Sequence, residues 1–227
     1  MAAVTNYLTL RAALADTVNR DDLSADVSSF EGTSIDGMIK RAIDKARIRI
    51  QRDLIARGGH RNMETVDTTL TTTANVEYID FPTDFLGHRT FMLTTNPLVV
   101  LEFLDPASLW KQYQSPTLAK PEKFTIVGTR RAYIRPVPDS SYTTRLLYYA
   151  AISSLSADTD TNWLIDGHWD LYISAAMLEL SLDLQNDDRI QFWKGDYDQK
   201  MNDLMGDDRN VRWAGIPARP SVDVVIA

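Results

Sequence analysis

The chain has 227 residues, of which 44% are hydrophobic, contains no cysteine and carries a formal net charge of −7 at pH 7. This length suffices to bury a sizeable core, which predicts a single domain over residues 1–227, and the missing cysteines exclude disulfides and thiolate metal sites. The negative charge argues against a general nucleic-acid binder. Because the chain has no long apolar run, we expect neither a membrane span nor a secretory signal.

Two helices are predicted within residues 7–58. The first is short and ends before a polar turn at 19–22, and residues 24–34 lack periodicity and are predicted as a loop. The second carries an apolar stripe at spacings of three and four, and Gly58-Gly59 is a typical helix stop. The stripe consists of Ile35, Ile39, Ala42, Ile43, Ala46, Ile50 and Leu54.

The other face of the second helix is basic. Between Ile35 and Arg57, seven Lys or Arg stand against three Asp, whereas Asp158 to Asp208 holds thirteen acids and three bases. One interpretation is a solvated face with local salt bridges. The other is that these oppositely charged regions pair, within one subunit or between neighbours in a ring. The residues assigned to such pairing are Arg41, Lys45, Arg47, Arg49 and Arg52.

Between residues 62 and 152 the hydrophobic pattern changes from helical to alternating, which predicts β-strands. They are expected at 76–81, 90–93, 98–104, 124–127, 132–135 and 143–151. Gly128-Thr129 predicts a tight hairpin turn, and Asp105-Pro106 predicts the capped start of a short helix. Together they predict a compact antiparallel sheet inserted between two helical halves, which is an α+β fold.

A helix hairpin is predicted within residues 164–205, with a polar turn at 185–188. We expect Asp166 or Asp170 to cap its first helix and Asp187 to cap its second. Apolar residues recur on one face of each helix: Leu171, Ala175, Leu178 and Leu182 in the first, and Ile190, Trp193, Tyr197, Met201 and Leu204 in the second. These faces need a further partner, and the N-terminal helices supply one.

Residues 207–227 are predicted to form an extended C-terminal arm. Two prolines and a glycine resist a helix there, and from Arg209 onward three Arg stand against one Asp. The segment is interpreted either as a disordered terminus or as an arm that orders on a partner. The residues expected to bind that partner are Arg209, Arg212, Trp213, Ile216, Pro217, Val224 and Ile226.

No motif of the sequence predicts catalysis, a cofactor or a bound metal. The histidines stand far apart, at His60, His88 and His168, and none belongs to a known ligand or catalytic pattern. Asp158, Asp160 and Asn162 imitate the start of a calcium loop, but Trp163 and Trp169 occupy its essential Gly and Glu positions. Three tryptophans, Trp163, Trp169 and Trp193, suit core positions better than a binding pocket. We therefore expect a protein that is not an enzyme.

Several short motifs follow one another across residues 7–205. They are Tyr7-Leu8-Thr9-Leu10, Asn19-Arg20-Asp21-Asp22-Leu23, Phe81-Pro82-Thr83-Asp84-Phe85, Pro121-Glu122-Lys123-Phe124-Thr125-Ile126-Val127-Gly128, Ile134-Arg135-Pro136-Val137-Pro138, Leu147-Tyr148-Tyr149-Ala150, and Asp187-Asp188-Arg189 before Phe192-Trp193. In order and spacing the chain resembles the head-to-tail adaptor (connector) proteins of tailed bacteriophages.

This resemblance implies a helical bundle from N- and C-terminal segments, an inserted β-rich region and no active site. It also implies a homo-oligomeric ring, commonly of twelve subunits, that lies at the head–tail junction of the virion and is assembled in the host cytoplasm. The implied partners are the portal protein, which the arm would embrace, and tail proteins of the nozzle or tail-tube kind. DNA would pass through without sequence-specific binding, because an acidic wall repels the duplex.

Two alternatives remain open from the sequence. One is another structural component of the same particle, such as a tail-completion or tail-tube protein. The other is a hydrolase or nuclease that uses converging Asp carboxylates and a divalent metal.

Overall fold

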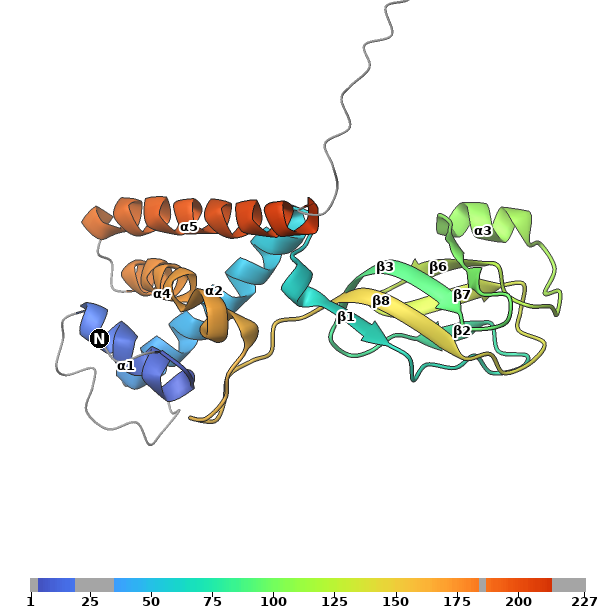
Figure 1. Cartoon of the computed structure of the whole chain (residues 1–227), viewed down its shortest axis with the longest axis horizontal. Helices are drawn as coiled ribbons and strands as arrows, with labels where there is room; N and C mark the ends of the chain where they lie inside the picture. Colours follow the sequence, from blue (N-terminus) through green and yellow to red (C-terminus); the bar gives the residue numbers. More distant parts are fainter. Residues whose placement is uncertain (1–3, 19–34, 184–186, 214–227) are drawn as a thin grey trace, which may run out of the picture. The chain divides into compact units, whose positions relative to one another are not determined.

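The computed structural model describes residues 4–18, 35–183 and 187–213 (Figure 1). The chain divides into two compact units: the helical unit, Met1–Asp53 with Ser154–Ala227, and the β unit, Leu54–Ser153. The fold class is α+β, as predicted. The predicted loop at 24–34 and the first part of the predicted turn at 185–188 lie outside the described residues.

The described part of the helical unit holds α1 (Tyr7–Val18), α4 (Trp163–Asp183), α5 (Asp187–Trp213) and all but the last three residues of α2 (Ile35–Ala56). At the start of α1, the Asn6 side chain accepts a hydrogen bond of 2.9 Å from the Thr9 amide. The Thr9 hydroxyl oxygen accepts one of 3.0 Å from the Asn6 amide, so the two residues cap the helix reciprocally. Within the described residues, no helix is both long and apolar enough to cross a membrane.

The apolar stripe predicted for α2 is buried in the structure. Its described members, each at most 2% exposed, are Ile39, Ala42, Ile43, Ala46, Ile50 and Leu54. The helix then ends as predicted: Gly58 and Gly59 have φ values of +98° and +80°. Their amides donate to the carbonyls of Ile55 and Leu54 at 3.0 and 2.8 Å, which satisfies the last turn of the helix.

Helices α4 and α5 form an antiparallel pair (Figure 1). Ser174 of α4 lies beside Asp196 of α5, whereas Asp170, one turn earlier in α4, lies beside Lys200, one turn later in α5. The apolar face predicted for α5 is confirmed, with Tyr197, Met201 and Leu204 buried and Ile190 and Trp193 half-buried.

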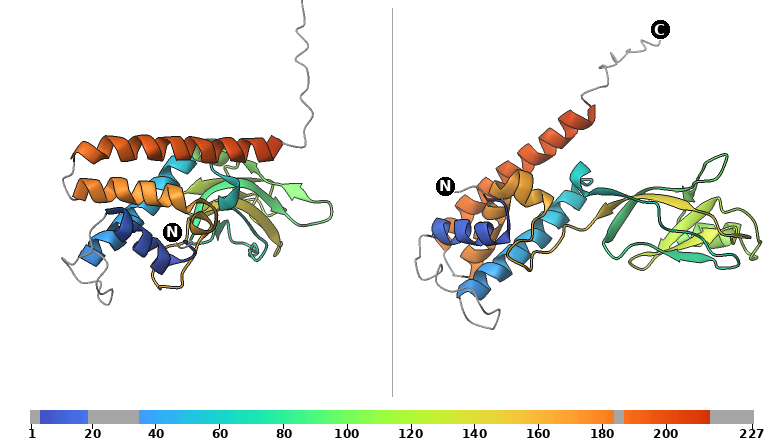
Figure 2. Two further views of the ribbon diagram at one scale, coloured as in Figure 1. Left: turned by 60° about the vertical axis from the view of Figure 1, so that its left-hand side comes forward. Right: turned by 60° about the horizontal axis from the view of Figure 1, so that its bottom comes forward.

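The apolar face predicted for α4 is buried at Leu171, Ala175 and Leu178, but burial is not confined to that face. The side chain of Leu182 lies outside the described part. Between Leu171 and Ser181 every residue except Glu179 is buried. The reason is the central position of α4, which packs against both α1 and α5 (Figure 2). A helix enclosed in this way is apolar around its circumference rather than along one stripe.

The cap predicted for α4 is wrong. Because α4 begins at Trp163, the capping residue is Asn162, whose side-chain oxygen accepts a hydrogen bond of 3.1 Å from the Ile165 amide. Asp166 instead accepts a bond of 2.8 Å from the Thr161 hydroxyl. The side chain of Asp187, the cap expected for α5, lies outside the described part.

Helix α5 continues past the boundary expected for the arm. It includes residues 207–213, which were predicted to be extended. A glycine inside a helix, as at Gly206, lowers helix stability by about 1 kcal/mol relative to alanine, a cost that the helix tolerates. The next turn is held by Asp208, only 4% exposed, which accepts a bond of 2.7 Å from the guanidinium of Arg212 one turn later.

The β unit contains, among its described residues, eight strands and two short helical segments: β1 (Glu64–Asp67), β2 (Tyr78–Asp80), β3 (Phe85–Leu93), β4 (Val99–Val100), β5 (Glu102–Phe103), β6 (Lys123–Val127), β7 (Arg131–Arg135), β8 (Thr144–Ala150), α3 (Pro106–Gln112) and the 3-10 turn η2 (Arg61–Met63). They form two four-stranded sheets, in the orders β1-β8-β3-β4 and β2-β7-β6-β5. The prediction of one antiparallel sheet is therefore wrong.

The predicted strand at 98–104 explains the second sheet. It is divided into β4, which pairs antiparallel with β3, and β5, which pairs parallel with β6 in the other sheet. The buried side chain of Leu101 lies between these two strands. The segment thus passes from one sheet to the other across the core.

Buried side chains from both sheets fill the space between them. Phe91 of β3 packs against Phe124 of β6 with ring centroids 5.3 Å apart, and Phe81 packs on Phe91 at 5.2 Å. The predicted hairpin is present, since Gly128 has a φ of +77° between the antiparallel strands β6 and β7. The Asp105 cap of α3 is confirmed by hydrogen bonds from the amides of residues 107 and 108, at 3.0 and 3.3 Å.

Candidate functional site

The outer face of α2 presents exposed cations. Arg41, Lys45 and Arg52 are exposed along this helix, and the apolar side chain of Ile48 between them is 37% exposed. A shallow cavity of about 490 Å³ lies here, lined also by Glu179 of α4. An exposed surface that combines cations with an aliphatic side chain is suited to contact an acidic protein face.

Arg49 of the basic helix α2 forms an ion pair with an acidic residue of α4, in the C-terminal part of the chain. Its Nε and Nη2 atoms lie 2.6 and 2.5 Å from the same Oε1 atom of Glu179. Arg47 lies 3.6 Å from Asp44, one turn earlier on its own helix. Charge complementarity thus operates inside the subunit at Arg49, and pairing between subunits stays a prediction.

A second polar contact joins the two ends of the helical unit. The hydroxyl of Tyr197 in α5 donates a hydrogen bond of 2.5 Å to Asp53 in α2. Tyr197 is 2% exposed, so the bond satisfies a polar group that burial would otherwise leave without water. Helix α2 is therefore tied to both helices of the C-terminal pair.

Ser174, Asp196 and Lys200 form the cluster that most resembles a catalytic arrangement. Lys200 Nζ lies 2.7 Å from Ser174 Oγ and 2.8 Å from Asp196, and Ser174 lies 2.5 Å from that carboxylate. Burial opposes ionisation of Asp196, but hydrogen bonds from Lys200 and Ser174 outweigh it, so the pKa of Asp196 is lowered. Because Ser174 is fully buried and Lys200 is ion-paired with Asp196, the cluster joins α4 to α5 and offers no accessible nucleophile.

The residues that imitate a calcium loop each have a structural partner. Asp158 forms an ion pair with Arg11, and Asn162 caps α4. Asp160 accepts hydrogen bonds from the amides of Ser156 and residue 157, which together lower the pKa of this carboxyl. These contacts stabilise the loop that leads into α4.

The three histidines lie in separate environments. His60 accepts a bond of 3.1 Å from the Asn62 amide, His88 packs edge-on against Phe124, and His168 lies at a kink in α4. Burial lowers the pKa of His88. Over the described ranges, no group of three or more His, Asp or Glu side chains is placed to hold a metal ion.

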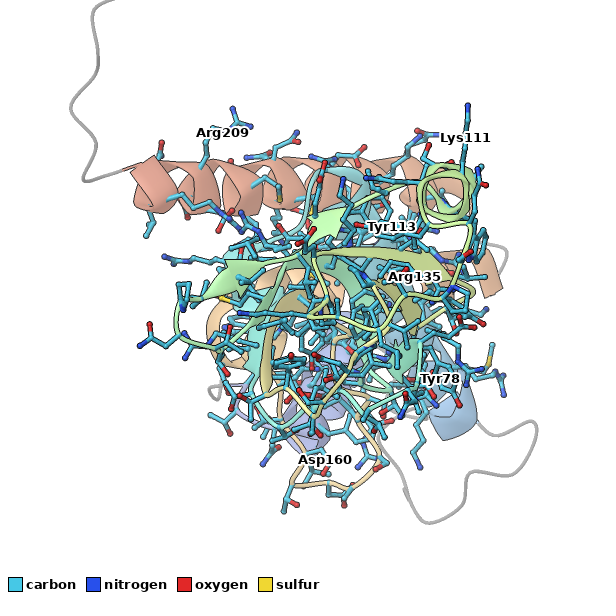
Figure 3. The ribbon with its side chains drawn as sticks, turned by 90° about the vertical axis from the view of Figure 1, so that its right-hand side faces the viewer. Tyr78, Lys111, Tyr113, Arg135, Asp160 and Arg209 are labelled. Atoms are coloured by element: carbon cyan, nitrogen blue, oxygen red, sulfur yellow. The ribbon has the colours of Figure 1, made fainter. Side chains whose placement is uncertain are left out.

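The residues predicted to bind a partner through the arm fall into two groups. Arg209 and Arg212 belong to α5, where Arg209 is exposed and points away from the helix (Figure 3) while Arg212 pairs with Asp208. Trp213 is the last residue of α5, and its side chain lies outside the described part. Ile216, Pro217, Val224 and Ile226 lie outside the described residues altogether.

A groove between α1, α4 and α5 was not anticipated from the sequence. It encloses about 360 Å³ and is lined mainly by apolar atoms, including Ala12 and Ala13 of α1 and Ile173 of α4. Trp169 and Trp193 border it; the first is 38% exposed and the second half-buried, so the core position expected for Trp169 is wrong. The groove is built from three helices, whereas sequence periodicity reports one helix at a time.

The β unit carries an exposed aromatic and charged cluster that sequence reasoning also missed. Arg131 binds Asp80 through two nitrogens at 2.8 and 3.1 Å, and its guanidinium lies 4.3 Å from the ring centre of Tyr78. The Arg131 hydrogen bonds hold the pKa of Asp80 below its usual value. The ring of Tyr133 lies between two others in this cluster: its centroid is 6.2 Å from that of Tyr78 (labelled in Figure 3) and 6.0 Å from that of Trp110.

These features define a scaffold: charged residues tie distant helices together, and the most exposed side chains are suited to protein contacts. The comparison with family models identifies the scaffold more closely. A model described as SU10 adaptor protein matches residues 5–220, and the chain belongs to this family. It is therefore a phage adaptor protein, with a structural role at the head–tail junction of the virion. Among curated proteins, no match was found.

Proposed function

We propose that the protein forms a ring beneath the phage portal, continues the DNA channel and provides the docking platform for tail proteins. The observation that carries this proposal is the adaptor family match, which covers residues 5–220 and thus both the helical and the β units. In this role the portal and the tail proteins are its partners, and a homododecamer is the expected ring. No reaction, cofactor or metal is required of it.

Ring closure needs a surface that recognises a different surface on the next copy. The exposed cations of α2, namely Arg41, Lys45 and Arg52, supply one such surface. Exposed acids of α5, namely Asp198, Asp203 and Asp207, supply a complementary one. We infer that the basic face of one subunit meets the acidic face of its neighbour, while Arg49 stays committed to Glu179 within the subunit.

The wall of the channel should be acidic. A conduit that neutralised phosphates would hold the DNA and make its passage sensitive to salt. The segment from Asp158 to Asp208, with thirteen acids against three bases, supports an assignment of the acidic helices or the β-unit loops to the lumen. A ring map whose lumen is lined by Arg41, Lys45 and Arg49 would contradict this.

The segment that we assign to the portal begins at Arg209. Arg209 is exposed and available, whereas the contact of Arg212 with Asp208 keeps the last turn of α5 helical. Residues 214–227 supply apolar anchors at Ile216, Val224 and Ile226. An extended segment with spaced apolar side chains suits a groove on a partner.

The decisive measurement is the mass of the purified protein, alone and mixed with portal protein, by native mass spectrometry. We expect a subunit that becomes a ring on the portal. Charge reversal at Arg41, Lys45 and Arg52 should reduce ring formation, and circular dichroism checks that the subunit of this variant is folded. Retained ring formation in that variant would contradict the contact we assign to α2.

The main alternative is another virion component, such as a tail-completion or tail-tube protein. A direct pull-down with portal protein distinguishes the two, because an adaptor binds the portal and a tail-tube protein does not. For the hydrolase or nuclease alternative, Mg²⁺ or Mn²⁺ titration should raise the melting temperature. A titration without such a shift would count against it.

A further inference from the structure

The groove between α1, α4 and α5 is an apolar surface left open within the helical unit. Ala12 and Ile173 are among its lining residues, and Trp169, which also lines it, is 38% exposed. On α5, Phe192 packs its ring against that of Trp193 and is 65% exposed. Exposed aromatic side chains around an apolar depression mark a surface that gains stability when a segment covers it.

The indole of Trp193 indicates what kind of segment would fit. Its Nε1 donor is buried, and no atom of the described residues accepts a hydrogen bond from it. Such a donor destabilises the folded state, but a segment lying in the groove does not reach it, because it is closed to solvent. Trp193 therefore offers the groove the apolar part of its half-buried ring, which favours apolar side chains in the segment that covers it.

The charges at the rim restrict the occupant further. Asp16 and Asp170 are exposed at the groove, whereas the cation there, Lys200, is already paired with Asp196. The rim is therefore acidic. A segment with acidic side chains would be repelled, and one with apolar side chains and a cation would be favoured.

Two segments of this chain outside the described residues differ in their charge and in their apolar content. Residues 19–34 contain four acids and one Arg, so their charge opposes the rim. Residues 214–227 contain one Arg, at position 219, one Asp and five large aliphatic side chains: Ile216, Val222, Val224, Val225 and Ile226. Pro217 and Pro220 also favour an extended conformation over a helix.

The second segment is long enough to reach the groove from its own helix. Trp213 lies 13 residues after Lys200 in α5, a rise of about 20 Å along the helix. Residues 214–227 number 14 and span up to about 46 Å when extended. A fold-back along α5 is therefore within reach.

We propose that residues 214–227 dock in the groove between α1, α4 and α5 of their own chain. Their aliphatic side chains cover Ala12, Trp169 and the half-buried ring of Trp193, and Arg219 meets the acidic rim. A further consequence rests on the proposed function: the same segment cannot bind the groove and the portal together, so portal binding would require its release.

Disulfide trapping in the full-length chain tests the docking without any portal protein. Because the sequence has no cysteine, two substitutions give a single possible pair. The test variant is Ala12→Cys with Ser221→Cys. The matched control is Asn202→Cys with Ser221→Cys, since Asn202 is exposed on α5 but does not line the groove.

We expect the intrachain disulfide to form about tenfold faster in the test pair than in the control pair, because docking raises the local thiol concentration. Adding Ile216→Asp and Ile226→Asp to the test pair should reduce its rate to that of the control. Equal rates in the two pairs would overturn the proposal and leave the groove to residues 19–34 or another protein. A test pair that yields only interchain disulfide would assign the segment to a second copy and would overturn the same-chain assignment.

Discussion

Arg49 in α2 and Glu179 in α4, 130 residues apart in sequence, meet through two guanidinium nitrogens at 2.6 and 2.5 Å from one carboxylate oxygen. The Glu179 side chain is 12% exposed and that of Arg49 is 36% exposed, so the pair is neither fully buried nor fully solvated. The contact anchors a helix from the first quarter of the chain to one from the last third.

Arg49→Met should lower the free energy of unfolding by about 1–2 kcal/mol, because it leaves the shielded carboxylate of Glu179 without its partner. Arg52→Met, on the exposed side of the same helix, should change it by less than about 0.5 kcal/mol. Urea denaturation of both variants gives the comparison. Similar losses in the two would show that the contact contributes nothing specific.

Gly59→Ala should destabilise the protein more than Gly58→Ala. Both glycines have positive φ, which strains an L side chain. At Gly59, however, the added Cβ would also lie 2.4 Å from the ring of Tyr149, whereas at Gly58 it meets nothing within 4 Å. We expect losses of about 2–4 and about 1–2 kcal/mol, measured by urea denaturation. An equal effect would mean that the Tyr149 ring moves aside freely.

The Ser174–Asp196–Lys200 cluster should make stability fall in acid. The pKa of Asp196 is lowered in the folded protein. The ionised carboxylate therefore stabilises the fold fully above pH 3.8, the ordinary pKa of Asp, and this stabilisation is lost as the pH falls through the lower folded-state pKa. Asp196→Asn should therefore flatten the loss of stability below pH 3.8. Asp198→Asn, exposed on the same helix, is the matched control and should leave the profile unchanged. The measurement is urea denaturation across an acid pH series.

Tyr148 should make stability fall in alkali. Burial, followed by the hydrogen bond that its hydroxyl donates to Asp84, raises the pKa of Tyr148 to about 12 from 10.0. A raised pKa gives stability that is complete below 10.0 and is lost as pH rises towards about 12. Tyr148→Phe should remove this component, whereas Tyr78→Phe, on an exposed tyrosine, should not. Phenolate absorbance followed against pH checks the assignment directly.

Features set by adjacent residues were predictable from the sequence. The stripe from Ile39 to Leu54 and the stop at Gly58-Gly59 were recognised, and so was the Asp105 cap, because helix periodicity and capping depend on residues a few positions apart. The family resemblance, based on the order of short motifs, was confirmed by the match over residues 5–220.

Features that depend on distant parts of the chain were not predictable in this way. Residues 98–104 look like one strand, yet Val99 and Glu102 pair with strands of different sheets. The burial of Ser174 within α4 depends on Asp196 and Lys200, which supply its hydrogen bonds from another helix. Pairing partners of this kind are tertiary information that periodicity does not contain.

The discontinuous helical unit has a consequence for synthesis on the ribosome. Its first part ends at Asp53 and its second begins at Ser154, so the 100 residues of Leu54–Ser153 are translated between them. At about 5–20 residues per second, synthesis of the intervening residues alone takes roughly 5–20 s, and the buried faces of α1 and α2 wait at least that long for α4 and α5. The β unit has all its strands before then, so it is placed to fold first, and the nascent N-terminal helices are the stretch on which a chaperone would act.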